Sequence, residues 1–237
     1  MVRSESLPIA TALPVSGELR EGSSGLWALW VADVDETQLD LSLLDVEESG
    51  RAATLVQPDD RLRYVAAHLV LRQLLSERLC VPPQAVAYFR EPCLHCGGPH
   101  GRPAVDRPTR PLHFSLSYSG GLVLIGIASA PMGVDVETLP ESETIDEVSA
   151  LLHPAEQIEI SSAGPSKRAS VFTHIWTRKE AYLKGIGVGV THDLAADYLG
   201  TEERAAPPLG WTVAAVPITA GYVAAAAVQC SLSHERA

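Results

Sequence analysis

Asp135 and Glu137 lie two positions apart in the stretch Gly133-Val134-Asp135-Val136-Glu137. Successive side chains of a β-strand alternate between its two faces, so both carboxylates would project to one side of a strand and the valines to the other. Two acids on one strand face can share a cation, but the same pattern also occurs on a solvated edge strand. Further residues must converge on the pair before it indicates a site.

The stretch "VFTHIWTRKEAYLKG" supplies such residues. On a helix its apolar side chains form one stripe, made by Val171, Phe172, Ile175, Trp176, Tyr182 and Leu183. Lys179 falls inside this stripe, where a charge is costly unless it is paired or extends to water. Glu180 precedes Lys184 by four residues, which favours a contact between them, although a surface helix with an ordinary ion pair would show the same spacing.

Together these stretches resemble the signatures of the phosphopantetheinyl transferases. "GVDVE" and "WTRKEAYLK" resemble (I/V)G(V/I)D and (F/W)xxKEAxxK. "FSLSYSG" is similar to the family's FNLSHS segment, "GRP" to its GKP element, and "DDRLRYVAAHLVLR" to its upstream helix. The matches follow the family's order over about residues 55 to 190, and the length of 237 residues resembles the single-chain, Sfp-type branch.

The resemblance implies an α+β fold made of two similar halves, each an antiparallel sheet with helices, in a pseudo-twofold arrangement. We expect a loose N-terminal segment at 1–25, an N-terminal half at 26–130 on the side of the adenine and the 3′-phosphate, and a C-terminal half at 131–237 that carries the metal and the catalytic helix.

The implied activity is transfer of the 4′-phosphopantetheine arm of coenzyme A to a serine of an apo acyl or peptidyl carrier protein, with release of adenosine 3′,5′-bisphosphate. Asp135, Glu137 and Glu180 would bind Mg²⁺, a hard ion that prefers oxygen ligands. By the same resemblance Glu180 is the general base, directly or through a metal-bound water. Lys184 would hold the phosphates and stabilise the leaving group.

Other positions match the family's coenzyme A contacts. Arg63 and Arg102 correspond to the arginine of the upstream helix and to the basic residue of GKP, and a guanidinium can bind phosphate oxygens in bidentate fashion. Lys179 is expected to emerge at the phosphates or to orient an acid. Glu156, in "HPAEQIE", matches an acid of the family's middle helix and would assist.

Ser117 and Tyr118 match the Ser-His pair that contacts the phosphates in the family. Tyr118 departs from the pattern, because a phenol donates one hydrogen bond but carries no positive charge near neutral pH. We therefore expect the affinity for coenzyme A, or its pH dependence, to differ from that of enzymes with histidine.

The loop "EPCLHCGGPHGRP" offers a competing interpretation, a structural zinc site. Such a site needs four ligands, and Cys93 and Cys96 with His95 or His100 would crowd them into eight residues. We favour a compact, turn-rich loop that ends at Arg102. A catalytically weak or silent module that binds coenzyme A or a carrier protein is another alternative.

Composition restricts the partners. The net charge of −11 disfavours nucleic acid and anionic membranes as partners. Four unevenly spaced cysteines are too few for a disulfide framework, and no secretory signal is visible, so we expect a cytoplasmic monomer. The expected partners are carrier domains of polyketide, nonribosomal peptide or fatty acid synthases, which would dock through apolar contacts from the segment 138–168.

The elements that must position these residues can be read along the chain. Hydrophobic periodicity predicts helices over about 42–80, 142–161 and 168–184. Strands are expected around "FSLSYSG" and "GVDVE". A C-terminal hairpin is expected to turn near Thr219–Gly221. "GIGVGV" follows a helix instead of a strand, which fits a helix end and not a dinucleotide-binding loop.

Overall fold

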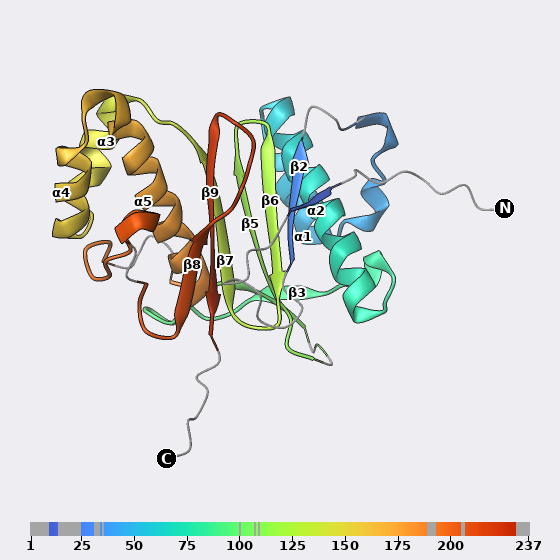
Figure 1. Ribbon diagram of the computed structural model, residues 1–237. Coiled ribbons are helices and arrows are strands. Elements are labelled where there is room, and N and C mark those ends of the chain that lie inside the picture. Colours follow the sequence, from blue (N-terminus) through green and yellow to red (C-terminus); the bar gives the residue numbers. More distant parts are fainter. Residues whose placement is uncertain are drawn as a thin grey trace, which may run out of the picture.

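The computed structural model describes residues 10–13, 25–30, 34, 36–99, 101–106, 108, 110–188, 193–204 and 207–230. Its strands form a central layer with helices on both sides (Figure 1). The predicted class, α+β with antiparallel sheets, is confirmed. None of the helices in the described ranges is long and apolar enough to span a bilayer.

The first sheet has six strands in the order β1-β2-β6-β5-β4-β3, all antiparallel. They are β1 (Thr11–Leu13), β2 (Gly25–Trp30), β3 (Tyr88–Arg90), β4 (Pro103–Val105), β5 (His113–Ser119) and β6 (Leu122–Ala128). Every residue of β6 is buried, which its apolar sequence "LVLIGIA" requires. β1 lies in the segment where the sequence predicted a loose lead-in, because pairing with β2 supplies its hydrogen bonds.

The second sheet has three strands in the order β7-β9-β8, also antiparallel. They are β7 (Met132–Thr138), β8 (Trp211–Ala215) and β9 (Tyr222–Gln229), so the C-terminal hairpin is confirmed. β7 follows β6 in the chain but pairs with β9, and the chain changes sheets between Ala128 and Met132. The division into domains with the bounds given above stays a prediction.

Helices beside the first sheet are η3 (Glu36–Gln38), η4 (Leu41–Leu43), α1 (Val46–Thr54), α2 (Pro58–Leu79) and η5 (Pro83–Ala85). The helical pattern predicted over about 42–80 is thus divided between α1, α2 and the short turn η4, and the helix expected to begin near Asp59 and Asp60 begins at Pro58. Asp45 begins α1 with a capping box to Glu48. Pro58 begins α2 at a position where a proline's missing N–H costs nothing. α2 buries apolar side chains against Phe114 of β5 and Ile125 of β6.

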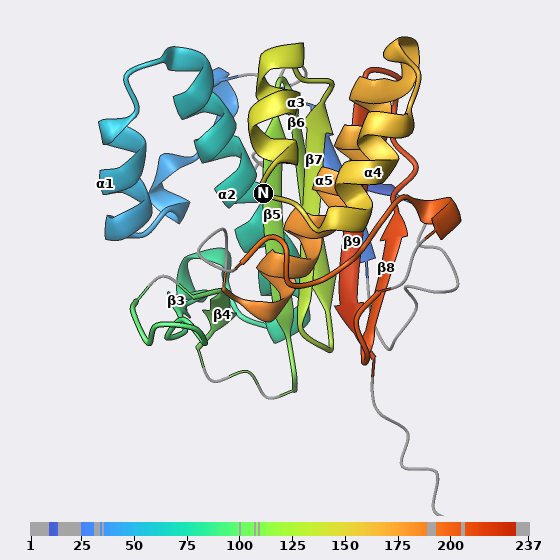
Figure 2. The same cartoon turned by 90° about the vertical axis from the view of Figure 1, so that its left-hand side faces the viewer.

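Helices beside the second sheet are α3 (Ser142–Ser149), α4 (Pro154–Ser162), α5 (Pro165–Ile186) and η7 (Glu202–Arg204). Figure 2 faces this side of the molecule. The helix predicted over 142–161 is split, because His153 caps a new helix at Pro154. α5 begins at Pro165, three residues before the predicted 168, and it ends at Gly187, whose φ of +80° is readily adopted by glycine.

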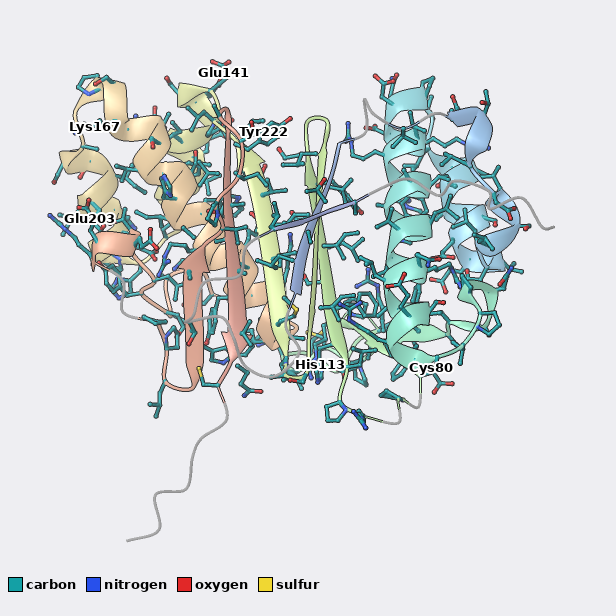
Figure 3. All side chains as sticks on the ribbon, turned by 45° about the vertical axis from the view of Figure 1, so that its right-hand side comes forward. Cys80, His113, Glu141, Lys167, Glu203 and Tyr222 are labelled. Carbon is teal, nitrogen blue, oxygen red and sulfur yellow. The ribbon has the colours of Figure 1, made fainter. Side chains whose placement is uncertain are left out.

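α5 packs directly on β7 because Gly133 has no side chain. A Cβ at this position would overlap the carbonyl oxygen of Ala181 and lie 2.6 Å from the backbone nitrogen of Gly185. The glycine of "GVDVE" thus allows the helix that carries Glu180 and Lys184 to approach the strand that carries the two acids. Cys80, which follows α2, and His113, at the start of β5, lie at the same end of the molecule (Figure 3).

Candidate active site

The acids of β7 lie close to two charged residues of α5, Glu180 and Lys184. Asp135 is 2% exposed, and Glu180 is 9% exposed. The Nζ atom of Lys184 lies 2.6 Å from Oδ1 of Asp135 and 3.0 Å from Oγ of Ser117. The sequence spacing had favoured a contact between Lys184 and Glu180. The structure instead gives Lys184 an ion pair with Asp135, a more deeply buried carboxylate of another element.

Electrostatics show that the three carboxylates are close neighbours. Burial raises the pKa of Asp135, while Lys184 and Ser117 oppose the shift. Burial, followed by the charge of Asp135, raises the pKa of Glu137. The pKa of Glu180 is raised from 4.5 to about 7, first by burial and then by Asp135, with Glu137 adding a smaller repulsion. A carboxylate with a pKa near 7 can exchange a proton at neutral pH.

This donor set suits a hard divalent cation. Oδ1 of Asp135 accepts hydrogen bonds from Ser117 and Lys184, whereas Oδ2 is buried without a hydrogen-bond partner. Such an atom is costly unless something else satisfies it, and a cation would do so. In the part of the chain that is described, no three His, Cys, Asp or Glu side chains stand close enough to hold one ion. Binding therefore requires side-chain adjustment at Lys184 or at the glutamates.

A cavity of about 330 Å³ opens beside these residues. Its lining includes three cationic side chains, Lys184, Arg102 and Arg90. It also includes acidic and aromatic side chains, among them Asp45, Glu47, Glu48, Tyr64, His68 and Tyr88. The cations suit phosphate groups, and Lys184 links the cavity to Asp135, which does not itself line it.

Arg102 and Tyr118, both predicted from the sequence, line this cavity. Nε of Arg102 donates to Glu91 at 2.6 Å, and its Nη1 donates to the carbonyl oxygen of Gly185 at 3.2 Å. The arginine therefore joins the β3–β4 hairpin to the end of α5. Tyr118 is 46% exposed, so its hydroxyl can reach a ligand. The expected roles of both residues toward coenzyme A stay predictions.

Arg63 does not line the cavity. Its Nη1 lies 3.3 Å from Asp60 one turn earlier in α2, and its Nε is buried without a hydrogen-bond partner. The upstream helix had been expected to direct this arginine to the cofactor. In this structure its Nη1 pairs with Asp60, and the expected role of Arg63 toward coenzyme A stays a prediction.

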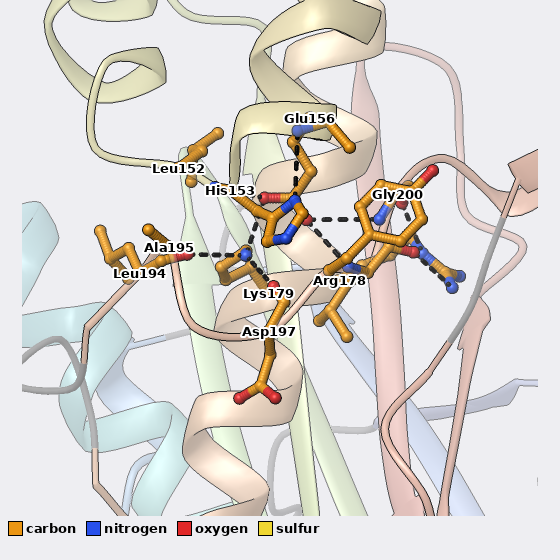
Figure 4. Close-up of polar contacts among 12 residues, drawn as sticks. Leu152, His153, Glu156, Arg178, Lys179, Leu194, Ala195, Asp197 and Gly200 are labelled. Atoms are coloured by element: carbon orange, nitrogen blue, oxygen red, sulfur yellow. Dashed lines mark hydrogen bonds and ion pairs between the residues drawn. The ribbon is translucent and has the colours of Figure 1, made fainter.

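Lys179 lies elsewhere, in a closed network between α4, α5 and the segment 193–200 (Figure 4). Its Nζ donates to Glu156 at 2.7 Å and to the carbonyl oxygens of Leu194 and Asp197 at 2.8 and 2.6 Å. Three acceptors use all three N–H bonds of an ammonium group. This position fits the second of the two expected roles, in which Lys179 orients an acid, here Glu156. We therefore interpret Lys179 as a structural residue, and the role toward coenzyme A stays a prediction that its position does not support.

Glu156 is fully buried and completes the same network. Its Oε1 accepts from the backbone nitrogens of Leu199 and Gly200, and its Oε2 accepts from His153 as well as Lys179. Arg178, which the sequence reasoning missed, donates to three carbonyl oxygens of the adjoining chain segments. Glu156 therefore fixes the fold around the residue before Glu180 and does not itself reach the cavity.

The cysteine loop is a compact turn, as favoured from the sequence. Cys93 is buried and Cys96 is exposed. The backbone nitrogen of Gly97 donates to the carbonyl oxygen of Cys93 at 2.7 Å, and that of Gly98 donates to Sγ of Cys96 at 3.4 Å. His100, a ligand considered in the zinc interpretation, lies outside the described residues.

Two features of the site were missed. Tyr64 stacks on His68 at 3.9 Å between ring centroids and forms one wall of the cavity. Ser115 and Ser119 flank Ser117 at alternate positions of β5, and all three hydroxyls contact β7. The alternation of serine in "SLSYS" was the signal that could have predicted this second feature.

Comparison with known proteins agrees with the motifs. Residues 131–227 match the family model described as the 4′-phosphopantetheinyl transferase superfamily. A putative 4′-phosphopantetheinyl transferase of Synechocystis sp. is 31% identical over 172 residues, 70% of this chain and 67% of the relative. The 4′-phosphopantetheinyl transferase HetI of Nostoc sp. is 30% identical over 170 residues, 68% of this chain and 69% of the relative.

Other relatives match over a shorter part. A 4′-phosphopantetheinyl transferase of Aneurinibacillus migulanus is 29% identical over 135 residues, 57% of this chain and 52% of the relative. The chain spans about half the length of that relative, and matched segments of similar extent recur in two Bacillus relatives.

Proposed function

The chain belongs to the 4′-phosphopantetheinyl transferase superfamily, a family of transferase enzymes, and on that premise we propose that it transfers the 4′-phosphopantetheine arm of coenzyme A to a serine of a carrier protein. The observation that carries the proposal is the ion pair between Asp135 and Lys184, because Lys184 also lines a cavity of about 330 Å³. Glu180 is close enough to both groups for their charges to affect its pKa.

In the proposed reaction the serine oxygen of the carrier attacks the β-phosphorus of coenzyme A. A P–O bond forms to the serine, and the bond between the β-phosphorus and the oxygen that bridges to the α-phosphate breaks. Adenosine 3′,5′-bisphosphate leaves with the electron pair of that bond. We propose Glu180 as the acceptor of the serine proton, directly or through a metal-bound water; its pKa of about 7 in the metal-free protein shows that it can carry a proton near neutral pH.

Positive charge must stabilise the leaving phosphate. Lys184 supplies an ammonium group at the edge of the cavity, and Arg102 supplies a guanidinium group beside the end of α5. We propose Asp135, Glu137 and Glu180 as Mg²⁺ ligands, which the unpartnered Oδ2 of Asp135 supports. When bound, Mg²⁺ polarises the pyrophosphate as a Lewis acid.

The proposed partners are acyl or peptidyl carrier domains. Large apolar side chains are exposed along the segment 138–168, with Leu139 52%, Leu151 59% and Ile158 63% exposed. They support docking through apolar contacts, as the acidic net charge would repel acidic carriers. Leu139→Glu should raise the KM for the carrier, and added salt should change the wild-type KM little. A steep loss of carrier affinity with salt would contradict this mode of docking.

The deciding experiment is mass spectrometry of an apo carrier protein incubated with coenzyme A, Mg²⁺ and this protein. We expect a mass increase equal to one phosphopantetheine arm, and none with Asp135→Asn or Glu180→Gln. A carrier in which alanine replaces the acceptor serine is the matched control. An unmodified carrier after incubation with folded wild-type protein would refute the transferase proposal.

Two alternatives are less well supported. A silent binding module would not need the acidic residues that the structure gathers around Asp135. A structural zinc protein would need more ligands than the described part of the cysteine loop brings together. We further propose that the protein acts as a monomer in the cytoplasm, because carrier synthases would be found in that compartment and cysteines stay reduced there.

A further inference from the structure

Three serine hydroxyls of β5 join the two sheets. Ser115, Ser117 and Ser119 alternate along β5, and their Oγ atoms accept hydrogen bonds from the backbone nitrogens of β7 at Val134, Val136 and Thr138. The distances are 3.1, 3.3 and 3.2 Å. Figures 1 and 2 show β5 and β7 side by side at this place. We call Ser115, Ser117 and Ser119 the serine ladder.

Two members of the serine ladder also contact the acids of β7. Oγ of Ser117 donates to Oδ1 of Asp135 at 2.7 Å, and Oγ of Ser119 donates to Oε2 of Glu137 at 3.0 Å. Ser115 also accepts a hydrogen bond from a backbone nitrogen of β7, that of Val134. The β7 residue that corresponds to Asp135 and Glu137 at this step is Gly133. Since glycine offers no carboxylate there, Ser115 is a natural internal control.

The ladder determines which carboxylate oxygen stays free. A serine hydroxyl has one hydrogen and two lone pairs, so a hydroxyl that accepts a backbone N–H is oriented to donate its hydrogen elsewhere. Ser117 and Lys184 both engage Oδ1 of Asp135, which leaves Oδ2 as the buried atom without a partner. Ser119 fixes one oxygen of Glu137 in the same way.

We propose that Ser119 is a positioning residue for the metal site, because it holds Glu137 in the orientation in which that carboxylate meets a divalent cation. The inference rests on the proposed function. Groups that orient metal ligands commonly affect metal affinity by about 10–100-fold when they are removed. Ser119 would act through Glu137 and would not touch the substrate.

The test is calorimetric titration of Mg²⁺ into the protein saturated with coenzyme A. Ser119→Ala should weaken Mg²⁺ binding by about 10-fold. Ser115→Ala, which loses one ladder contact but no contact to a carboxylate, should leave it within about 2-fold. Ser119→Thr keeps the hydroxyl and should restore affinity. Melting temperatures establish that each variant is folded, and Ser119→Cys replaces Ser119→Ala if the alanine variant is not.

Two results would overturn the inference: wild-type Mg²⁺ affinity in the folded Ser119 variant, or an equal loss in Ser115→Ala, which would make the ladder a joint between sheets only. Failure of the proposed function looks different. In that case the wild-type protein itself would bind no Mg²⁺ in the presence of coenzyme A.

Discussion

The ammonium group of Lys184 lies 2.6 Å from Oδ1 of Asp135, an ion pair that joins α5 to β7. Asp135 is 2% exposed, whereas the side chain of Lys184 is 29% exposed. The buried carboxylate thus depends on a lysine that can still reach the cavity. A cation that bound Oδ2 of Asp135 would take over part of this role and free Lys184 for a phosphate.

Replacement of Lys184 should therefore destabilise the metal-free protein. Lys184→Met leaves Asp135 without its ion pair, and the free energy of unfolding should fall by up to about 3 kcal/mol. Mg²⁺ alone should raise the melting temperature of the variant more than that of the wild type, because the cation replaces the lost charge partner of Asp135. Lys167→Met, at an exposed position of α5 (Figure 3), is the matched control. Equal stability of the Lys184 variant and the wild type would count against this role.

The raised pKa of Glu180 predicts a pH dependence of stability without metal. The pKa is about 7 in the folded protein against an ordinary 4.5, so the folded state binds more protons between these values. The stabilisation of the folded state by the proton on Glu180 is complete below pH about 4.5. It is lost as the pH rises through about 7, and the free energy of unfolding then falls by at most about 3 kcal/mol. Glu180→Gln should flatten this decline.

Thermal unfolding in EDTA from pH 4.5 to 8 measures the effect. Glu203→Gln, at an exposed site (Figure 3), should keep the wild-type slope. A wild-type curve that rises between pH 5 and 7 and is unchanged by Glu180→Gln would contradict the assignment.

Replacement of Lys179 should affect mainly the stability of the protein, whereas replacement of Arg102 should affect mainly coenzyme A binding. Lys179→Ala leaves Glu156 as a fully buried, unpaired charge, and the free energy of unfolding should fall by about 3–5 kcal/mol. Arg102→Ala should change stability less and raise the KM for coenzyme A by about 10-fold. Urea denaturation and steady-state kinetics separate the two. A stable Lys179 variant with a raised KM for coenzyme A would return Lys179 to the binding site.

Tyr118 should set the pH dependence of coenzyme A binding. Tyr118→His introduces a group with an ordinary pKa of about 6.5, so the variant should bind coenzyme A several-fold more tightly at pH 6 than at pH 8, relative to the same ratio for wild type. Tyr118→Phe removes the hydroxyl without adding charge and should show the wild-type ratio. Identical ratios for all three proteins would show that position 118 does not contact the phosphates.

The sequence predicted the local elements of the site well. The alternation in "GVDVE" placed Asp135 and Glu137 on one strand, and the spacing in "WTRKEAYLK" placed Glu180 and Lys184 on one helix. The interruption at Pro154 was missed, because a proline at the first position of a helix looks in a periodic pattern like a continuation of the previous helix.

What the sequence by itself determined were features that depend on neighbours along the chain: strand alternation, helical stripes and the glycine that ends α5. Only the tertiary structure decided the partners of the charged groups. Lys179 meets Glu156 and carbonyl oxygens from the segment 193–200, and Lys184 meets Asp135. These pairs depend on how α5 packs on β7 and on the cost of burying an unpaired charge. Both involve residues far apart in the sequence, so no periodic pattern along the chain reveals them.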